Sequence, residues 1–325
     1  MPGKRSGPPA RRPTGARSAG ADHRDIRVLA VPAADQVPGS DRGQSVHVDA
    51  GGQREMKLAL HPATCGGDPD VMADYCRYMG VTDLFYQLHD VEGYRDGGFD
   101  NPDALIALAD KFRAVGLRIT AINDFLPNSA DELDKRREGL ASTVDALAQA
   151  GIETLILFVL QQQQDDIRQS LVRLYEELVP RAGAAGVNIA THGHWCDGHI
   201  AYNAESLRRI VDICPEPANG ICLCAGCFYQ AGDDVDEVVR NMPERIHAVH
   251  IRDTSAVGGC DLEERALGSG TVPIPDTLAA LRDIGYRGLV IPEHLSGVRA
   301  QANMEVTHAH AVGYLQGIIA SQQGG

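Results

Sequence analysis

Four side chains in the second half of the chain are of the types that bind a transition-metal ion. They are His192, Cys224, His250 and Glu293, which offer two imidazoles, one sulfur and one carboxylate. One thiolate combined with nitrogen and oxygen donors suits zinc, manganese, iron or cobalt, whereas calcium takes oxygen ligands and magnesium prefers them. The four residues therefore predict a divalent metal site, provided that the fold brings them together.

Each of these residues alone also has a structural explanation, because a buried histidine or cysteine is more often packed or hydrogen-bonded than bound to a metal. Cys224 is the most ambiguous, since it belongs to a Cys-x-Cys-x-x-Cys run with Cys222 and Cys227. These cysteines could be core thiols, or with His194 could hold a structural zinc ion. The sequence lacks, however, the second pair of closely spaced cysteines that a zinc ribbon has. Alternation along a strand would place Cys222 on the same face as Cys224, one layer deeper.

From Met56 onward, short apolar runs alternate with longer amphipathic stretches. We expect strands at residues 57–61, 83–88, 118–123, 154–160, 187–192, 220–224, 246–252 and 289–293. We expect helices at residues 70–79, 102–115, 130–150, 165–185, 204–213, 234–241, 276–284 and 304–320. Eight such units predict an α/β protein with a parallel sheet closed into a (β/α)8 TIM barrel. The alternative, an open doubly wound sheet, is weakened because no Gly-x-Gly-x-x-Gly sequence follows the first strand.

In such a barrel the catalytic groups lie at the carboxyl ends of the strands. The fifth to eighth expected strands end at or next to the four metal-binding candidates, so the fold would bring these donors to one mouth. Arg252, two residues after His250, could hold a substrate carboxylate with two hydrogen bonds, or could belong to an ion pair. Other polar residues near strand ends are candidates for binding substrate hydroxyl groups. These candidates are His61, Gln87, Asn123 and His194.

The first 55 residues differ in composition from the rest of the chain. They hold nine Lys and Arg against six Asp and Glu, a charge of +3, and are rich in Pro, Gly, Ala and Arg. We expect residues 1–55 to be a disordered basic extension, or to precede the true start at Met56. Residues 56–325 are expected to form the TIM-barrel catalytic domain, the one folded domain of the chain.

The remainder holds 21 Lys and Arg against 38 Asp and Glu, a charge of −17, which argues against nucleic acid or an anionic membrane as a partner. The sequence contains no run of 18 apolar residues, so it predicts no transmembrane helix. Eight cysteines without a secretory signal indicate a cytoplasmic protein whose cysteines are thiols rather than disulfides. A small molecule is the expected partner, and a homo-oligomer is compatible with the sequence.

Beyond these patterns, the chain resembles the mannonate dehydratases, a family of the xylose isomerase-like TIM-barrel superfamily. The segments that carry the resemblance are ANGICLCAG at residues 218–226, ERIHAVHIRD at 244–253, VNIATH at 187–192 and PEH at 292–294. The resemblance covers most of residues 56–320. It implies that the four donors named above bind the metal and that His294 and Arg252 are catalytic, His294 as an acid or base and Arg252 facing the substrate. It also implies a hydro-lyase that converts D-mannonate into 2-keto-3-deoxy-D-gluconate with a divalent ion; manganese is the first expectation, then iron, cobalt or zinc.

The chain departs from that family at several points. Glu293 stands where the family has Asp, and Gly-His-Trp-Cys-Asp at residues 193–197 replaces an acidic, proline-rich loop. No Pro-Gly-Tyr segment with the family's catalytic tyrosine follows His294. A sister activity on another sugar acid is therefore an alternative. A second alternative is a metal-dependent sugar or sugar-phosphate isomerase or epimerase, although those enzymes take a carboxylate from the fourth strand, and residues 154–160 end in none.

Overall fold

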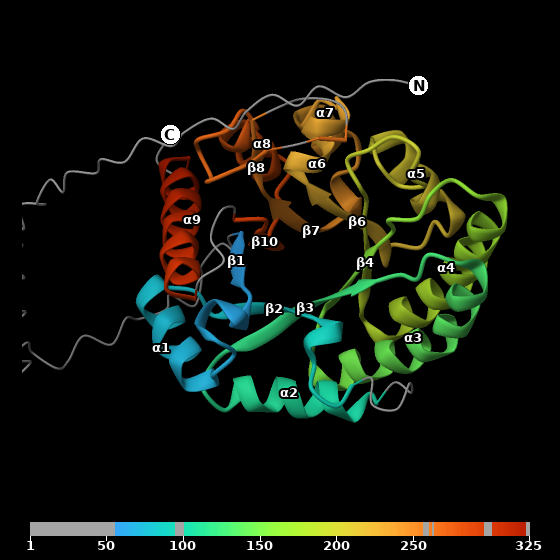
Figure 1. Cartoon of the computed structure of the whole chain (residues 1–325), viewed down its shortest axis with the longest axis horizontal. Helices are drawn as coiled ribbons and strands as arrows, with labels where there is room; N and C mark the ends of the chain where they lie inside the picture. The colour runs from blue at the N-terminus through green and yellow to red at the C-terminus, as the bar shows by residue number, and fades with distance from the viewer. Residues whose placement is uncertain (1–55, 95–100, 256–259, 262, 296–300, 323–325) are drawn as a thin grey trace, which may run out of the picture. The chain divides into compact units, whose positions relative to one another are not determined.

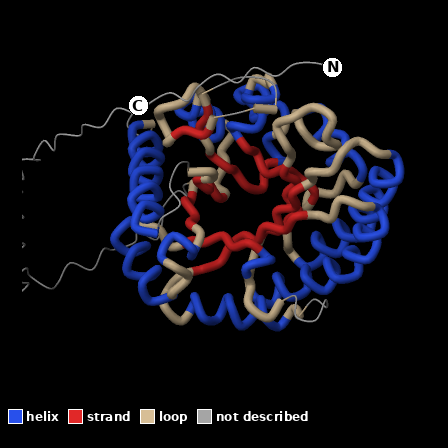
Figure 2. The backbone as a smooth tube through the Cα atoms, viewed as in Figure 1, coloured by secondary structure: helices blue, strands red, loops and turns tan. Residues whose placement is uncertain are grey.

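The computed structural model describes residues 56–94, 101–255, 260, 261, 263–295 and 301–322. The extension expected at residues 1–55 lies outside these residues. In the described part, eight parallel strands close into a barrel in the order β1-β10-β7-β6-β5-β4-β3-β2. Helices surround this ring of strands (Figures 1 and 2). The expected (β/α)8 TIM barrel is confirmed.

The observed elements agree with the expected ones to within a few residues. The barrel strands are β1 (Lys57–Leu60), β2 (Asp83–Gln87), β3 (Arg118–Phe125), β4 (Thr154–Phe158), β5 (Asn188–His192), β6 (Asn219–Cys224), β7 (Ile246–Ile251) and β10 (Leu289–Pro292). The helices are α1 (Pro69–Met79), α2 (Asp103–Arg113), α3 (Ala130–Ala150), α4 (Asp165–Ala185), α5 (Ala204–Ile213), α6 (Ala225–Ala231), α7 (Val235–Asn241), α8 (Ile274–Asp283) and α9 (Gln301–Ser321). The sequence did not predict α6, nor the short hairpin of β8 (Asp253–Thr254) and β9 (Glu264–Arg265).

Alternation along the strands separates two buried layers. In β4, Leu155 and Leu157 pack outward in the main core, whereas Ile156 and Phe158 belong to a second cluster. That second cluster lies inside the barrel and combines four alanines and Cys222 with five large apolar residues, which fills a narrow cylinder. In β6 the same alternation turns Cys222 inward while Leu223 packs outward. Alternate side chains of each strand therefore face the barrel interior, and those at the carboxyl ends of the strands lie at its mouth.

Helix ends follow local sequence signals. Asp68 caps α1 by accepting hydrogen bonds from the backbone N–H groups of Asp70 and Val71, and Asn203 caps α5 in a reciprocal capping box with Ser206. Glycines in the left-handed conformation end α1, α3 and α4, where a side chain would be strained. In the described part of the chain, no helix has the length and apolar character needed to span a membrane.

Asp253 organises the segment that follows β7. Its buried carboxylate accepts hydrogen bonds from the backbone N–H groups of Thr254, Gly268, Gly270 and Val272, at 2.9–3.1 Å. A Cβ at Gly270 would lie 2.1 Å from Oδ1 of Asp253, so only glycine fits there. One carboxylate thus fixes the return of the chain from the β8–β9 hairpin to α8.

We predict that Asp253→Asn lowers the free energy of unfolding of the metal-free protein by about 2–4 kcal/mol, because the amide nitrogen replaces an acceptor of buried N–H groups. Urea unfolding measures this. Asp236→Asn is the control, since Asp236 forms an exposed ion pair with Arg240 and its loss costs less than about 1 kcal/mol. Equal effects of the two substitutions would contradict the role given to Asp253.

Candidate metal centre

The carboxyl ends of β5, β6, β7 and β10 bring His192, Cys224, His250 and Glu293 together. Oε2 of Glu293 lies 3.6 Å from Sγ of Cys224 and 3.8 Å from Nε2 of His192. Oε1 of Glu293 lies 3.1 Å from Nδ1 of His250. His192, Cys224 and His250 are buried, and the Glu293 side chain is 14% exposed. The structure therefore places three of the four expected metal-binding residues around the carboxylate of the fourth, Glu293.

These residues fit a divalent cation. Both ring nitrogens of His192 and of His250 are buried without a well-directed hydrogen bond within the described residues. Unpaired buried nitrogens are costly unless another group satisfies them. Donors that share one ion at about 2.0–2.3 Å lie roughly 3–4 Å apart, which is the spacing that Glu293 has to the other three.

Protonation within the cluster follows from burial and mutual contact. Burial by itself would raise the pKa of Glu293, but the imidazoles of His250 and His192 hold it well below its usual range. Burial would lower the pKa of His192, but Cys224 and Glu293 raise it to about 9. Burial raises the pKa of Cys224 well above that of a free thiol. Cation binding must therefore expel protons from Cys224 and His192.

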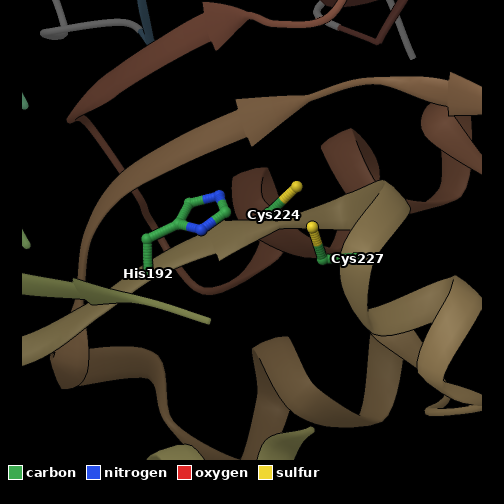
Figure 3. A group of neighbouring side chains, drawn as sticks. All are labelled: His192, Cys224 and Cys227. Atoms are coloured by element: carbon green, nitrogen blue, oxygen red, sulfur yellow. The ribbon is translucent and has the colours of Figure 1, made fainter. Parts of the chain in front are cut away.

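A second buried cysteine, Cys227, adjoins this cluster. Sγ of Cys227, Sγ of Cys224 and a ring nitrogen of His192 all lie within 4.8 Å of one another (Figure 3). Cys222 forms a similar group with His192 and His250. The alternative of a zinc site that joins the Cys-x-Cys-x-x-Cys run to His194 receives no such support, because the ligand atoms of His194 group with other residues, Cys196 and His199.

His294 turns toward the metal-binding candidates because β10 ends at Pro292. A continuing strand would point His294 away from Glu293, but its φ of 48° places it in the left-handed region, which is unusual for a residue with a side chain. Its Nε2 lies 3.6 Å from Oε1 of Glu293, and its Nδ1 lies 3.5 Å from Oε1 of Glu264. Burial lowers the pKa of His294 despite the neighbouring Glu293 carboxylate, so the neutral imidazole prevails near neutral pH.

Arg252 is buried beside the same site and has charged and aromatic partners. It pairs with Glu264, so the ion pair considered as an alternative for Arg252 is present. Its guanidinium carbon lies 4.8 Å from the centre of the Trp195 ring, within cation–π range, and Nη1 lies 3.6 Å from Sγ of Cys227. A Cβ at Gly226 would lie 2.2 Å from Cγ of Arg252, so the glycine after Cys224 and Ala225 gives the arginine its room.

A cavity of about 560 Å³ opens above these groups. Its lining includes Arg252, His294 and all four candidates for hydroxyl recognition, which are His61, Gln87, Asn123 and His194. Oδ1 of Asn123 is buried without a hydrogen-bond partner among the described residues, so it is available to a ligand. Burial lowers the pKa of both His61 and His194 to about 4. Both rings are therefore neutral near pH 7.

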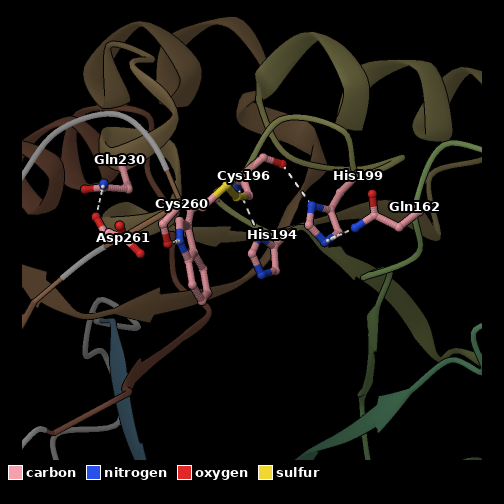
Figure 4. Close-up of a disulfide and its surroundings, with 8 residues drawn as sticks. Gln162, His194, Cys196, His199, Gln230, Cys260 and Asp261 are labelled. Carbon is pink, nitrogen blue, oxygen red and sulfur yellow. Dashed lines mark hydrogen bonds between the residues drawn. A yellow bond between two sulfur atoms is a disulfide. The ribbon is translucent and has the colours of Figure 1, made fainter. Parts of the chain in front are cut away.

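The expectation that all eight cysteines are thiols is wrong for two of them. Cys196 and Cys260 form a disulfide that joins the loop after β5 to the segment before β9 (Figure 4). The two Cα atoms are 5.0 Å apart, and Nε1 of Trp195 donates a hydrogen bond to the carbonyl oxygen of Cys260. The remaining six cysteines are free and buried. Sequence spacing could not reveal the pair, because 64 residues separate them and only the barrel brings their loops together.

Sequence reasoning missed two residues of the site, Glu264 and Trp195. Glu264 lies in the unpredicted β8–β9 hairpin, among other acidic residues that share its local pattern. Trp195 was seen only as part of a divergent loop, and its ring stacks on His194 with centroids 3.9 Å apart. The one available signal was that Trp195 is the single tryptophan of the chain and lies next to the histidines after β5.

The chain matches a known family of TIM-barrel proteins. A family model described as "Xylose isomerase-like TIM barrel" matches residues 74–312. Mannonate dehydratase of Enterococcus faecalis is 27% identical over 140 residues, which cover 40% of this chain and 39% of that protein. This match confirms the resemblance seen in the sequence, although it spans only about two fifths of that relative's length.

Solved structures share the fold. The crystal structure of mannonate dehydratase from Streptococcus suis serotype 2 has a TM-score of 0.69 at 17% identity and covers 82% of this chain and 93% of that chain. The structure of an L-ribulose 3-epimerase has a TM-score of 0.64 at 16% identity and covers 82% of this chain and 96% of that chain. At these identities the likeness establishes the barrel architecture.

The lowered pKa of His61 predicts a contribution to acid sensitivity. Because the folded protein disfavours protonation of His61, stability is lost as pH falls from 6.5 toward 4, by up to about 3 kcal/mol from this residue. His61→Asn keeps an acceptor for the N–H of Ala63 but removes the ring, so we expect a shallower loss over that range. Urea unfolding of metal-free protein at several pH values measures it. An unchanged slope in His61→Asn would contradict the assignment.

Proposed function

Because the chain belongs to the xylose isomerase-like TIM-barrel family, we propose that it is a hydro-lyase that dehydrates a sugar acid with the help of a divalent metal ion. The matched relatives include mannonate dehydratases, so the proposed substrate is D-mannonate and the product 2-keto-3-deoxy-D-gluconate. The proposal rests on one observation, the convergence of two imidazoles, a thiol and a carboxylate at the barrel mouth. Residues 56–325 would be the catalytic domain.

The proposed ligands of the ion are His192, Cys224, His250 and Glu293. When bound, the ion would act as a Lewis acid toward the carboxylate or neighbouring hydroxyl group of the substrate, which offsets the negative charge that develops as the α-proton leaves. Manganese, the first ion expected from the sequence, suits a set with one thiolate, as do iron, cobalt and zinc.

His294 is proposed to move the proton. Dehydration removes a proton from the carbon next to the carboxylate and delivers one to the departing hydroxyl group. His294 lines the cavity beside Glu293, and its neutral form can accept a proton near neutral pH. No tyrosine occurs among the described residues that line the cavity, in line with the missing Pro-Gly-Tyr segment.

Arg252 is proposed to bind the substrate carboxylate. Its Nε is buried without a partner among the described residues, while the two terminal nitrogens contact Glu264 and Cys227. The Nε–H group is therefore left for a substrate oxygen, beside the second N–H of each terminal nitrogen, and the aromatic face of Trp195 keeps the guanidinium in place. His61, Gln87, Asn123 and His194 would bind the hydroxyl groups.

An isomerase or epimerase of the same superfamily is the second candidate, favoured by the shared fold with an L-ribulose 3-epimerase. The cavity argues against it, because β4 contributes Phe158 and the following Leu160 to the described lining and no carboxylate. Incubation with D-mannonate and separately with ketohexoses distinguishes the two. A 2-keto-3-deoxy product supports the dehydratase, and C3 epimers support the alternative.

We predict that Cys224→Ser and His250→Ala each lose most of the bound metal and, with it, D-mannonate dehydration. Each substitution removes a donor that the remaining residues cannot replace at the same distance. Metal analysis of the purified protein and an assay for the 2-keto-3-deoxy product check both properties. Cys214→Ser is the control, since Cys214 is a buried cysteine at the end of α5. Full activity in either site variant would show that the metal site is misplaced.

His294→Gln separates proton transfer from metal binding. We expect kcat to fall by about 10²- to 10⁴-fold, the usual contribution of a general acid or base, while the metal content stays at the wild-type level. The same metal analysis and a steady-state assay with D-mannonate measure these quantities. A loss of metal together with activity would instead indicate that His294 is a ligand.

A further inference from the structure

Cys227 has no role in the proposed reaction, yet it lies next to the proposed metal ligands. Helix α6 begins directly after Cys224, so Cys227 is one turn further along and returns to the same side. Its side chain is 4% exposed, and its sulfur lies within 4.8 Å of Sγ of Cys224 and of a ring nitrogen of His192 (Figure 3). Two sulfurs on one ion at about 2.3 Å each can be at most about 4.6 Å apart. A small adjustment would therefore let both sulfurs bind one ion.

We propose that Cys227 is a second thiolate ligand of the metal ion at the barrel mouth, and that the site therefore selects zinc, cobalt or iron over manganese. This inference rests on the proposed function only in assuming that His192 and Cys224 bind an ion. Thiolates favour the softer transition metals, and a second one moves the preference further from manganese. The expectation of manganese assumed a single thiolate.

Arg252 supports the assignment through its contact with the same sulfur. Its Nη1 donates to Sγ of Cys227 at 3.6 Å. Metal-bound ligands are commonly held by an outer hydrogen bond, which this contact would supply to Cys227. Arg252 would thus connect the substrate carboxylate to the metal site through Cys227.

Cys222 provides an internal comparison. Its ligand atom also lies within 4.8 Å of those of His192 and His250. It belongs, however, to the apolar cluster inside the barrel, with Phe85 and Ile291 among its members, and is 1% exposed. Its surroundings are those of a packed core thiol, so we assign it no metal contact.

The test uses the full chain, stripped of metal, reduced, and reconstituted with one equivalent of Co²⁺. The near-ultraviolet sulfur-to-cobalt charge-transfer absorption reports the number of bound thiolates. We expect this absorption, per bound cobalt ion, to fall to about half in Cys227→Ala, because one thiolate of two remains. It should be unchanged in Cys222→Ala, the matched control. With zinc and manganese supplied together, Cys227→Ala should also show an about tenfold lower ratio of bound zinc to bound manganese.

The outcomes separate the two proposals. Full absorption per bound cobalt ion in Cys227→Ala would overturn the role of Cys227 and leave the proposed metal site intact. A loss of the charge-transfer absorption in Cys222→Ala but not in Cys227→Ala would also overturn the role of Cys227. No cobalt binding by the wild type would overturn both. X-ray absorption of the zinc-loaded wild type needs no variant: two sulfur neighbours at about 2.3 Å support the inference, and one refutes it.

Discussion

The buried carboxylate of Glu293 is the group on which the arrangement at the barrel mouth depends. A carboxylate in this position is tolerated because the imidazoles of His192 and His250 lie on either side of it and hold its pKa low. The parallel barrel makes this possible, since it delivers all four donors from the carboxyl ends of strands to one mouth. Without a cation, the imidazole nitrogens stay poorly satisfied and the thiol keeps its proton. The fold thus builds the cluster that we propose to bind a metal ion.

The part of the site beside the metal-binding candidates is organised around the positive charge of Arg252, whereas the candidates themselves surround the carboxylate of Glu293. Arg252 is fully buried, and each of its contacts restricts it: Glu264 by charge, Trp195 by its aromatic face and Cys227 by its sulfur. Glu264 comes from the β8–β9 hairpin, whose return to α8 is fixed by the carboxylate of Asp253. Trp195 is held by its hydrogen bond to Cys260. The loop after β5, the β8–β9 hairpin and helix α6 therefore position one guanidinium at the cavity wall.

Much of this could be predicted from sequence, because the signals were local. Strand and helix periodicity, helix caps and the count of eight repeats gave the barrel, and the barrel alone placed His192, Cys224, His250 and Glu293 together. What could not be predicted depends on contacts between loops. The Cys196–Cys260 disulfide, the ion pair of Arg252 with Glu264 and the contact of Arg252 with the Trp195 ring join segments with no shared sequence pattern. The turn of His294 toward the site depends on one backbone angle.

The charge of the cavity limits which sugar derivatives it can hold. Among the described residues that line it, Arg252 is the single Lys or Arg, and Glu264 already balances its charge. The pKa values of His61, His194 and His294 are lowered, so these rings add no positive charge near neutral pH, and the raised pKa of His192 is matched by the adjacent Glu293 carboxylate. A phosphate group carries more than one negative charge and needs several cationic or N–H donors. A substrate with a single carboxylate and several hydroxyl groups matches this cavity better than a sugar phosphate, which favours the sugar-acid reaction over the sugar-phosphate alternative.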